Sequence, residues 1–209
     1  MNVRSRVIIV FSVALGVVLS LTGIAFASVS DIRGHWAEQQ INDWVNRGLV
    51  TGYPDGRFRP DQNITRAEFI TLVNKAFGFH EKIKFSFDDV SSANWFYNEV
   101  AAAMAAGYIR GYVDNTMRPD QPITRQEVAA ITYRLLNRPA AVDSNVLGNF
   151  VDAASISSWS KPGVVAIVEK KVMKGYSDQT FRPQVFTSRA EAVVSLERAF
   201  WLKYPVVIN

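Results

Sequence analysis

One pattern recurs three times along this chain, and it restricts the possible folds more than any other feature. Each copy has a Gly-Tyr pair, an Arg-Pro pair that begins seven residues after the glycine, and an Arg-x-Glu element that begins six residues after the proline. The copies start at Gly52, Gly111 and Gly175. Recurrence at a fixed internal spacing is typical of arrays in which each unit buries its apolar face against its neighbours. The sequence therefore predicts three similar structural units.

Each repeat contains two stretches with helical periodicity. In the first repeat, apolar residues recur at helical spacing from Trp36 to Val45, and Gly48 is a typical helix stop. Turn-forming residues follow over 52–63, and Thr65 then opens a second helix. We expect an all-α fold of three helix–loop–helix repeats spanning residues 29–80, 87–138 and 150–200, with a tail over 201–209.

The second helix of each repeat begins with a capping box, in which a hydroxyl and a carboxylate each bind a free helix amide. The sequence places a hydroxyl residue three positions before a glutamate in every copy. We expect a capping and supporting role for these pairs, which are Thr65 and Glu68, Thr124 and Glu127, and Ser188 and Glu191.

An arginine follows the hydroxyl residue each time, at Arg66, Arg125 and Arg189. A cation at this position faces the positive end of the helix dipole, which costs about 0.3–1 kcal/mol. Two interpretations account for it. The guanidinium pairs with a carboxylate of a neighbouring repeat, or it joins the helix N-terminal amides in a site that binds a carboxylate or a phosphate.

Three tryptophans and three glycines also occupy equivalent positions. Trp36, Trp95 and Trp159 fit the apolar core, although an exposed tryptophan can also stack on a sugar ring. Gly52, Gly111 and Gly175 fit turn geometry, and a glycine also lets a ligand approach the backbone closely.

The N-terminus has the pattern of an export signal. Arg4 and Arg6 precede an uncharged run, and Ala25-Phe26-Ala27 ends that run with a signal-peptidase site. We expect residues 1–27 to be removed. The alternative is an uncleaved segment that tethers the protein to a membrane. Without residues 1–27 the formal charge falls from +4 to +2, because both removed charges are arginines.

Composition excludes several kinds of site. The chain has no cysteine and two histidines, His35 and His80, so thiol catalysis and cysteine-bound metals are absent and histidine-based sites have little support. The near-neutral remainder gives no support for nucleic-acid binding. We expect no catalytic residue, no metal and no cofactor.

Taken together, the three repeats resemble S-layer homology motifs, the modules that hold surface proteins on bacterial cell walls. The resemblance rests on Asp31 to Trp36, on the run Gly48–Gly56, and on Ile64–Glu68 with their equivalents. It implies one pseudo-threefold spindle around a central three-helix bundle, with ligand grooves between adjacent motifs. The third repeat departs most, with Lys171 where the others have glycine and Ser188 where they have threonine.

The resemblance also implies a function. The ligands of such motifs are secondary cell-wall polysaccharides, often with a pyruvate ketal, and the Arg, Trp and Gly residues above become the ligand-binding set. We expect a secreted, non-catalytic protein of the cell wall or S-layer. The alternatives are an adaptor that binds another surface protein, and an exported wall hydrolase.

Overall fold

The computed structural model describes residues 29–141 and 144–205, and these are helical apart from loops and isolated β-bridges. The predicted signal segment over residues 1–27 lies outside the described residues. The α-helices are α1 (Glu38–Asn46), α2 (Arg66–Phe77), α3 (Tyr97–Ala105), α4 (Arg125–Leu135), α5 (Lys161–Glu169) and α6 (Arg189–Lys203). Two short 3₁₀ helices, η1 (Ser144–Asn149) and η2 (Ala153–Ser155), lie between α4 and α5. The predicted all-α class is confirmed.

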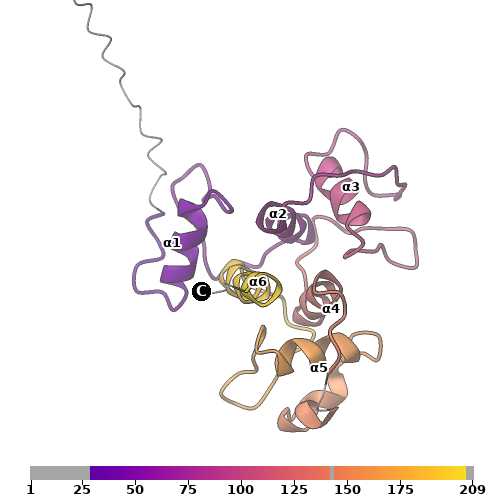
Figure 1. Ribbon diagram of the computed structural model, residues 1–209. Coiled ribbons are helices and arrows are strands. Elements are labelled where there is room, and N and C mark those ends of the chain that lie inside the picture. Colours follow the sequence, from indigo (N-terminus) through magenta and orange to yellow (C-terminus); the bar gives the residue numbers. More distant parts are fainter. Residues whose placement is uncertain (1–28, 142–143, 206–209) are drawn as a thin grey trace, which may run out of the picture.

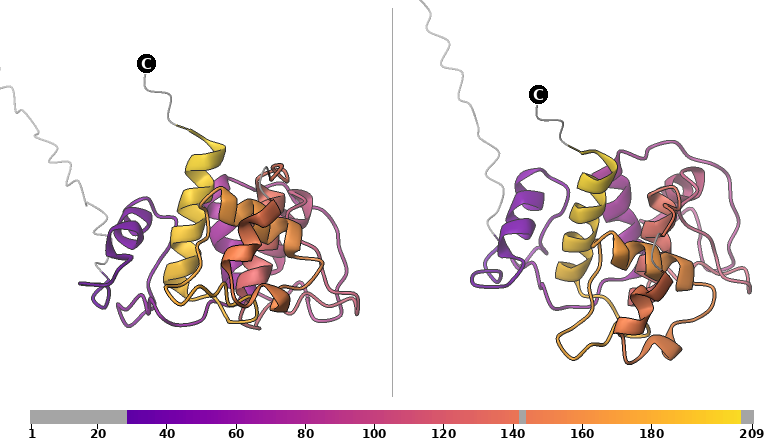
Figure 2. Two further views of the ribbon diagram at one scale, coloured as in Figure 1. Left: turned by 90° about the horizontal axis from the view of Figure 1, so that it is seen from below. Right: turned by 60° about the horizontal axis from the view of Figure 1, so that its bottom comes forward.

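The second helix of each repeat lies at the centre of the molecule, and the first lies at the periphery. Figure 1 shows α2, α4 and α6 together in the middle, with α1, α3 and α5 around them at three corners. The side views of Figure 2 show α6 running along this central bundle. The structure thus has the predicted three-repeat arrangement around a central three-helix bundle.

Each peripheral helix packs against the central helix of the preceding repeat. The contacts run from α3 to α2, from α5 to α4 and from α1 to α6. The first two pairs are neighbours in the sequence, whereas α1 and α6 come from the two ends of the described chain. The α1–α6 contact therefore closes the three repeats into a ring.

Backbone hydrogen bonds join the three loops in a cycle just before the central helices. The Ile64 amide donates to the Thr187 carbonyl at 3.0 Å, the Thr187 amide to the Ile123 carbonyl at 2.9 Å, and the Ile123 amide to the Ile64 carbonyl at 3.1 Å. All three residues are buried. This triangle fixes the N-terminal ends of α2, α4 and α6 relative to one another.

The peripheral helices end in a left-handed residue in every repeat. Gly48 has φ of 68°, Gly107 has 73°, and Lys171 has 60° at the equivalent position. A lysine pays a steric cost that glycine does not. The backbone path is thus the same in the third repeat, despite its different residue.

Among residues 29–141 and 144–205, no helix combines the length and the apolar character that crossing a bilayer requires.

Candidate functional site

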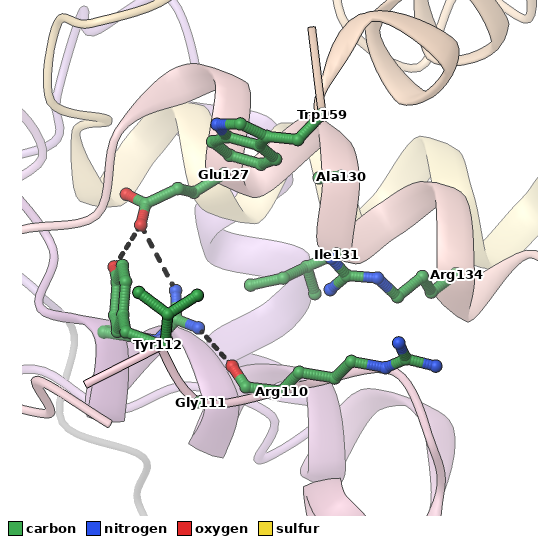
Figure 3. A pocket seen from close by; sticks show the side chains of 10 residues that line it. Arg110, Gly111, Tyr112, Glu127, Ala130, Ile131, Arg134 and Trp159 are labelled. Carbon is green, nitrogen blue, oxygen red and sulfur yellow. Dashed lines mark hydrogen bonds and ion pairs between the residues drawn. The ribbon is translucent and has the colours of Figure 1, made fainter. Parts of the chain in front are cut away.

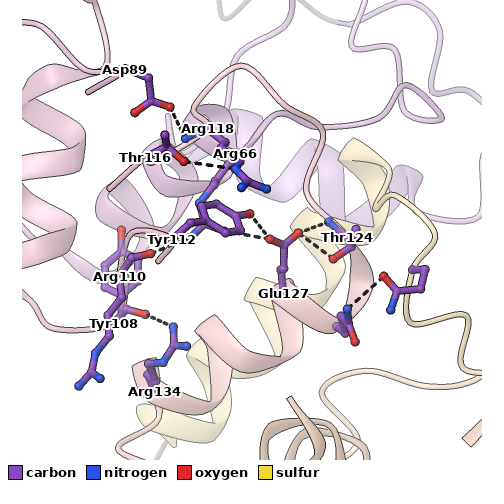
Figure 4. Close-up of polar contacts among 12 residues, drawn as sticks. Arg66, Asp89, Tyr108, Arg110, Tyr112, Thr116, Arg118, Thr124, Glu127 and Arg134 are labelled. Carbon is purple, nitrogen blue, oxygen red and sulfur yellow. Dashed lines mark hydrogen bonds and ion pairs between the residues drawn. The ribbon is translucent and has the colours of Figure 1, made fainter. Parts of the chain in front are cut away.

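The arginine at the start of each central helix reaches into the loop of the next repeat. Arg66 Nη2 donates to the Arg110 carbonyl at 2.9 Å, and its Nη1 lies 3.4 Å from Glu127 Oε1 (Figure 4). Its guanidinium also lies over the Tyr112 ring, 4.9 Å from the centroid. Arg66 itself is 6% exposed. A largely buried cation is therefore paired with a carboxylate, a carbonyl and an aromatic face.

The same contacts continue around the ring. Arg125 Nη1 lies 3.0 Å from Glu191 Oε1, and its Nε and Nη2 donate to the carbonyls of Phe181 and Lys174, each at 2.9 Å. Arg189 returns to the first repeat, where it lies 3.7 Å from Glu68 and donates to carbonyls of that loop. The ion pair between neighbouring repeats, one of the two sequence interpretations, is thus present at all three positions.

The helix amides are not available to an external anion. The amides of Arg66 and Ala67 donate to the Gln121 and Pro119 carbonyls, each at 2.9 Å. The equivalent amides of α4 and α6 donate to the following loop in the same way. The interpretation that these amides bind a ligand is therefore wrong. The reason is that the next loop supplies carbonyls that satisfy the positive end of each helix.

Capping boxes are present at all three central helices. The Thr65 amide donates to Glu68 Oε2 at 2.9 Å, and the Glu68 amide donates back to the Thr65 hydroxyl at 3.2 Å. Thr124 with Glu127, and Ser188 with Glu191, form the equivalent pairs. Each glutamate thus caps its own helix with one oxygen and faces the arginine of the preceding repeat with the other.

A tyrosine lies beside the arginine–glutamate pair at each contact between repeats. The Tyr112 hydroxyl donates to Glu127, and the Tyr176 hydroxyl donates to Glu191 at 2.5 Å. Burial raises the pKa of Glu127, but hydrogen bonds from Tyr112 and Thr124 outweigh this and hold it below its usual value. Burial and the glutamate bond raise the pKa of Tyr112 and of Tyr176 to about 12. At neutral pH Glu127 is therefore charged, and Tyr112 and Tyr176 are neutral.

The repeated tryptophans lie outside the core. Trp36, Trp95 and Trp159 are 60%, 62% and 54% exposed, whereas Trp44 is fully buried in α1. The core interpretation of the repeated tryptophans is wrong because the peripheral helices start later than periodicity predicts. Helix α1 begins at Glu38, so Trp36 lies in the turn before the helix, outside the helical stretch that packs into the core.

Each tryptophan lines a groove that contains residues of all three repeats. The groove in Figure 3 combines Arg66 of the first repeat, Gly111, Tyr112 and Glu127 of the second, and Trp159 of the third. We name it the Arg66 groove. The Arg125 groove has Gly175, Tyr176 and Glu191 with Trp36, and the Arg189 groove has Gly52, Tyr53 and Glu68 with Trp95. The structure thus brings the predicted residues together as three related sets.

The grooves differ in size. The Arg66 groove has a volume of about 340 Å³, and the Arg125 and Arg189 grooves have about 220 Å³ each. Each volume is large enough for a small sugar-sized group, and each groove is open to solvent on one side. The shape suits part of an extended polymer better than a fully enclosed ligand.

The repeated glycines are required by internal packing. A Cβ atom at Gly111 would lie 2.2 Å from the Phe87 ring, and one at Gly175 would lie 2.3 Å from the Phe150 ring. At Gly52 the contact is 2.8 Å, to Val29 and to the Arg57 carbonyl. These glycines therefore line the grooves at positions where the packing behind them admits no side chain.

Further cations line the grooves, and the sequence prediction missed them. One occurs nine residues after each central-helix arginine, at Lys75, Arg134 and Arg198. Another precedes the groove glycine in two repeats, at Arg110 and Lys174, where the first repeat has Thr51. The nine-residue recurrence was visible in the sequence, but on a helix surface a cation alone does not distinguish a groove from a solvated face.

The model of the S-layer homology domain matches this chain at residues 30–70, 86–129 and 149–193. A cellulosome-anchoring protein of Acetivibrio thermocellus is 33% identical over 158 residues, which are 72% of this chain and 35% of that protein. An S-layer protein of Bacillus licheniformis is 29% identical over 178 residues, 84% of this chain and 20% of that protein.

Some relatives carry the names of enzymes. An exoglucanase, XynX of Acetivibrio thermocellus, is 32% identical over 82% of this chain, but the match covers 16% of the enzyme. This chain therefore spans about a sixth to a third of the length of these three relatives. With three matched regions that follow its three repeats, this chain belongs to the S-layer homology domain family.

Proposed function

We propose that this protein binds an anionic cell-wall polysaccharide through its three grooves and performs no catalysis itself. The chain is a cell-surface protein, as are its S-layer relatives. The observation that supports the proposal most directly is the content of each groove, which is lined by an exposed tryptophan and by at least two cations. A flat aromatic face and a cation are the two groups that an acidic sugar requires.

The chemistry fits a carboxylate on a sugar. Arginine binds both oxygens of a carboxylate with its planar fork, and each charge-assisted bond contributes about 1.5–3 kcal/mol where water is excluded. A pyruvate ketal would supply that carboxylate at regular positions on a polymer. Binding through several grooves then raises the overall affinity by about 10²–10⁴, because the second contact is intramolecular.

The first test is sedimentation of the purified protein with cell wall. We expect the protein to pellet with intact wall and to remain in the supernatant after mild acid has removed the ketals. Equal pelleting with both preparations would refute the carboxylate mechanism. Pelleting with wall from which all polysaccharide has been stripped would favour the alternative, an adaptor that binds a surface protein.

The tryptophans provide the matching test on the protein. Because Trp36, Trp95 and Trp159 are exposed, replacing all three by alanine should leave the fold intact and weaken wall binding by about tenfold or more. Trp201 is a suitable control, because it is 46% exposed and lies outside the grooves. An equal loss in Trp201→Ala would show that the grooves are not the binding site.

A further inference from the structure

The three grooves are built alike, but their cations differ in number or in kind. The Arg66 groove contains Arg66, Arg110 and Arg134 against one carboxylate, Glu127. The Arg189 groove contains Arg189 and Lys75 against Glu68, with Thr51 at the position of Arg110. The Arg66 groove is also the largest of the three. Its excess positive charge comes from Arg110 and Arg134.

Neither of these arginines has a carboxylate partner within residues 29–141 and 144–205. Glu127 already faces Arg66 and accepts from Tyr112 and Thr124. Arg134 Nη1 donates to the Tyr108 carbonyl at 3.1 Å, and the Arg110 side chain is exposed. Burial, together with the charges of Arg110, Arg66 and Arg138, holds the pKa of Arg134 below its usual value. A bound anion would relieve this crowding of like charges.

The arrangement in space agrees with the charges. Figure 3 shows the side chains of Arg110 and Arg134 in the part of the groove farther from Glu127 and Tyr112, where they run in opposite directions, and their charges lie close enough to interact. Arg66 is turned toward Glu127 and the Arg110 carbonyl, so its two Nη atoms serve the contact between repeats, and its Nε is buried with no hydrogen-bond partner among the described residues. A ligand in this groove would therefore meet Arg110 and Arg134 more directly than Arg66.

The Arg125 groove is intermediate. It has Lys174 in place of Arg110 and Arg198 in place of Arg134. An ammonium lacks the planar fork of a guanidinium, and Glu197 lies close enough to Arg198 for the two charges to interact. This groove has the same number of cations as the Arg66 groove, but they are less suited to a carboxylate.

We propose that the Arg66 groove is the primary anion site, in which Arg110 and Arg134 hold the carboxylate of the sugar, and that the Arg125 and Arg189 grooves bind the same group more weakly in that order. This inference rests on the proposed function. The preference for one groove is thereby assigned to Arg110 and Arg134, which lie outside the repeated Arg-x-Glu element. The Arg-x-Glu element itself joins neighbouring repeats.

The order of filling is measurable, because each groove has its own tryptophan. The probe is a soluble pyruvylated fragment of wall polysaccharide, titrated into the full protein with ¹⁵N-labelled tryptophan. We expect the indole signal of Trp159 to move at the lowest concentration, followed by Trp36 and then Trp95. Trp44, in the core, and Trp201, outside the grooves, are internal controls whose signals stay fixed.

The other outcomes are distinguishable. Simultaneous movement of the three groove signals, or movement of Trp95 first, would overturn the ranking and leave the proposed function standing. No movement of any of them would refute the proposed function itself. The depyruvylated fragment should not produce the movement of Trp159, and an equal response to it would overturn the role of the carboxylate.

The chain offers matched variants for the residue assignment. Arg110→Thr introduces the residue of the first repeat, and it should weaken the first binding step about tenfold. Arg57→Thr is the control, since the other two repeats have Thr116 and Thr180 at that exposed position outside the grooves, and it should change binding less than twofold. Thr51→Arg should strengthen the step reported by Trp95. Equal effects of Arg110→Thr and Arg57→Thr would overturn the assignment.

Discussion

The role of some residues in this protein depends on the neighbouring repeat that their side chains contact. Arg66 stands at the start of α2, yet the groups that compensate its charge belong to the second repeat. Glu127 in turn caps its own helix and faces that arginine. The unfavourable position of the arginine on its own helix is therefore offset by contacts in another repeat.

One residue on the central axis departs from its equivalents at a cost in stability. Thr187 occupies the place of Ile64 and Ile123, and its hydroxyl is buried without a hydrogen-bond partner within the described part of the chain. Replacing it by valine removes that hydroxyl at nearly constant volume. We expect Thr187→Val to raise the free energy of unfolding by about 1 kcal/mol, measured by urea denaturation.

A second threonine serves as the control for this change. The Thr71 hydroxyl donates to the Ala67 carbonyl at 3.0 Å, so Thr71→Val removes a bond that is made. It should bring no gain in stability. If both variants gain equally, the unpaired hydroxyl is not the cause.

The tyrosines of the clusters predict how stability depends on alkaline pH. Tyr112 and Tyr176 keep their protons up to about pH 12 in the folded protein, whereas tyrosines of an unfolded chain titrate near pH 10. Between these values the unfolded state binds fewer protons, so the free energy of unfolding falls as pH rises. We expect the thermal midpoint to fall more steeply from pH 10 to 12 in the natural protein than in the double variant Tyr112→Phe, Tyr176→Phe. Parallel curves would contradict the raised pKa values.

At the scale of elements, the sequence predicted the central helices well and the peripheral ones less so. The capping residues gave the starts of α2, α4 and α6 directly, because the capping box is a local signal. Helix α1 began two residues after Trp36, since an apolar residue at helical spacing also fits a turn. Helix α6 runs to Lys203, three residues beyond the predicted end of the third repeat.

Other parts of the site could not be predicted locally. The contact of α1 with α6, and the meeting of three repeats in each groove, depend on residues far apart in the sequence. The resemblance implied grooves. It did not distinguish an arginine that pairs with a neighbouring repeat, such as Arg66, from one that is available to bind a ligand, such as Arg110. That distinction requires the partners of each guanidinium, which only the folded chain shows.

The loop of the first repeat is less well packed than the other two. Phe87 and Phe150 fill the space behind Gly111 and Gly175, whereas Val29 stands at the equivalent position behind Gly52. An apolar cavity of about 160 Å³ remains there, lined by Val29 and Val45 among others. We expect Val29→Phe to fill it and to raise the free energy of unfolding by about 0.5–2 kcal/mol.

The reverse change tests the same idea. Phe87→Val should lower the stability by more than 1 kcal/mol, because it opens a cavity behind Gly111. Both variants can be compared by thermal denaturation. A loss of stability in Val29→Phe would mean that the first loop cannot accommodate the ring.

At the scale of the whole molecule, the ring closure predicts a single unfolding transition. Arrays of repeats often unfold in parts, because each repeat contacts only its neighbours. Here the first and third repeats are joined by α1 and α6, by Arg189 and by the backbone bond between Ile64 and Thr187. Unfolding measured by helix content and by tryptophan fluorescence should therefore coincide.

Breaking the closing contact should lower the stability of every part together. We expect Arg189→Met to reduce the free energy of unfolding by about 2–4 kcal/mol, because Glu68 and the loop carbonyls lose their partner. Arg59→Met is the control, since Arg59 forms an exposed pair with Asp55. Two separate transitions in the Arg189 variant would show that the repeats are independent units.

The closed ring also limits how such a chain can change over generations. Every repeat receives an arginine from one neighbour and gives its own to the other, so duplication or loss of a single repeat leaves one donor and one acceptor unmatched. The backbone triangle of Ile64, Ile123 and Thr187 likewise has three places, so a fourth repeat has no partner in this ring. Each repeat contributes different residues to all three grooves, so substitutions at different positions of one repeat reach different grooves.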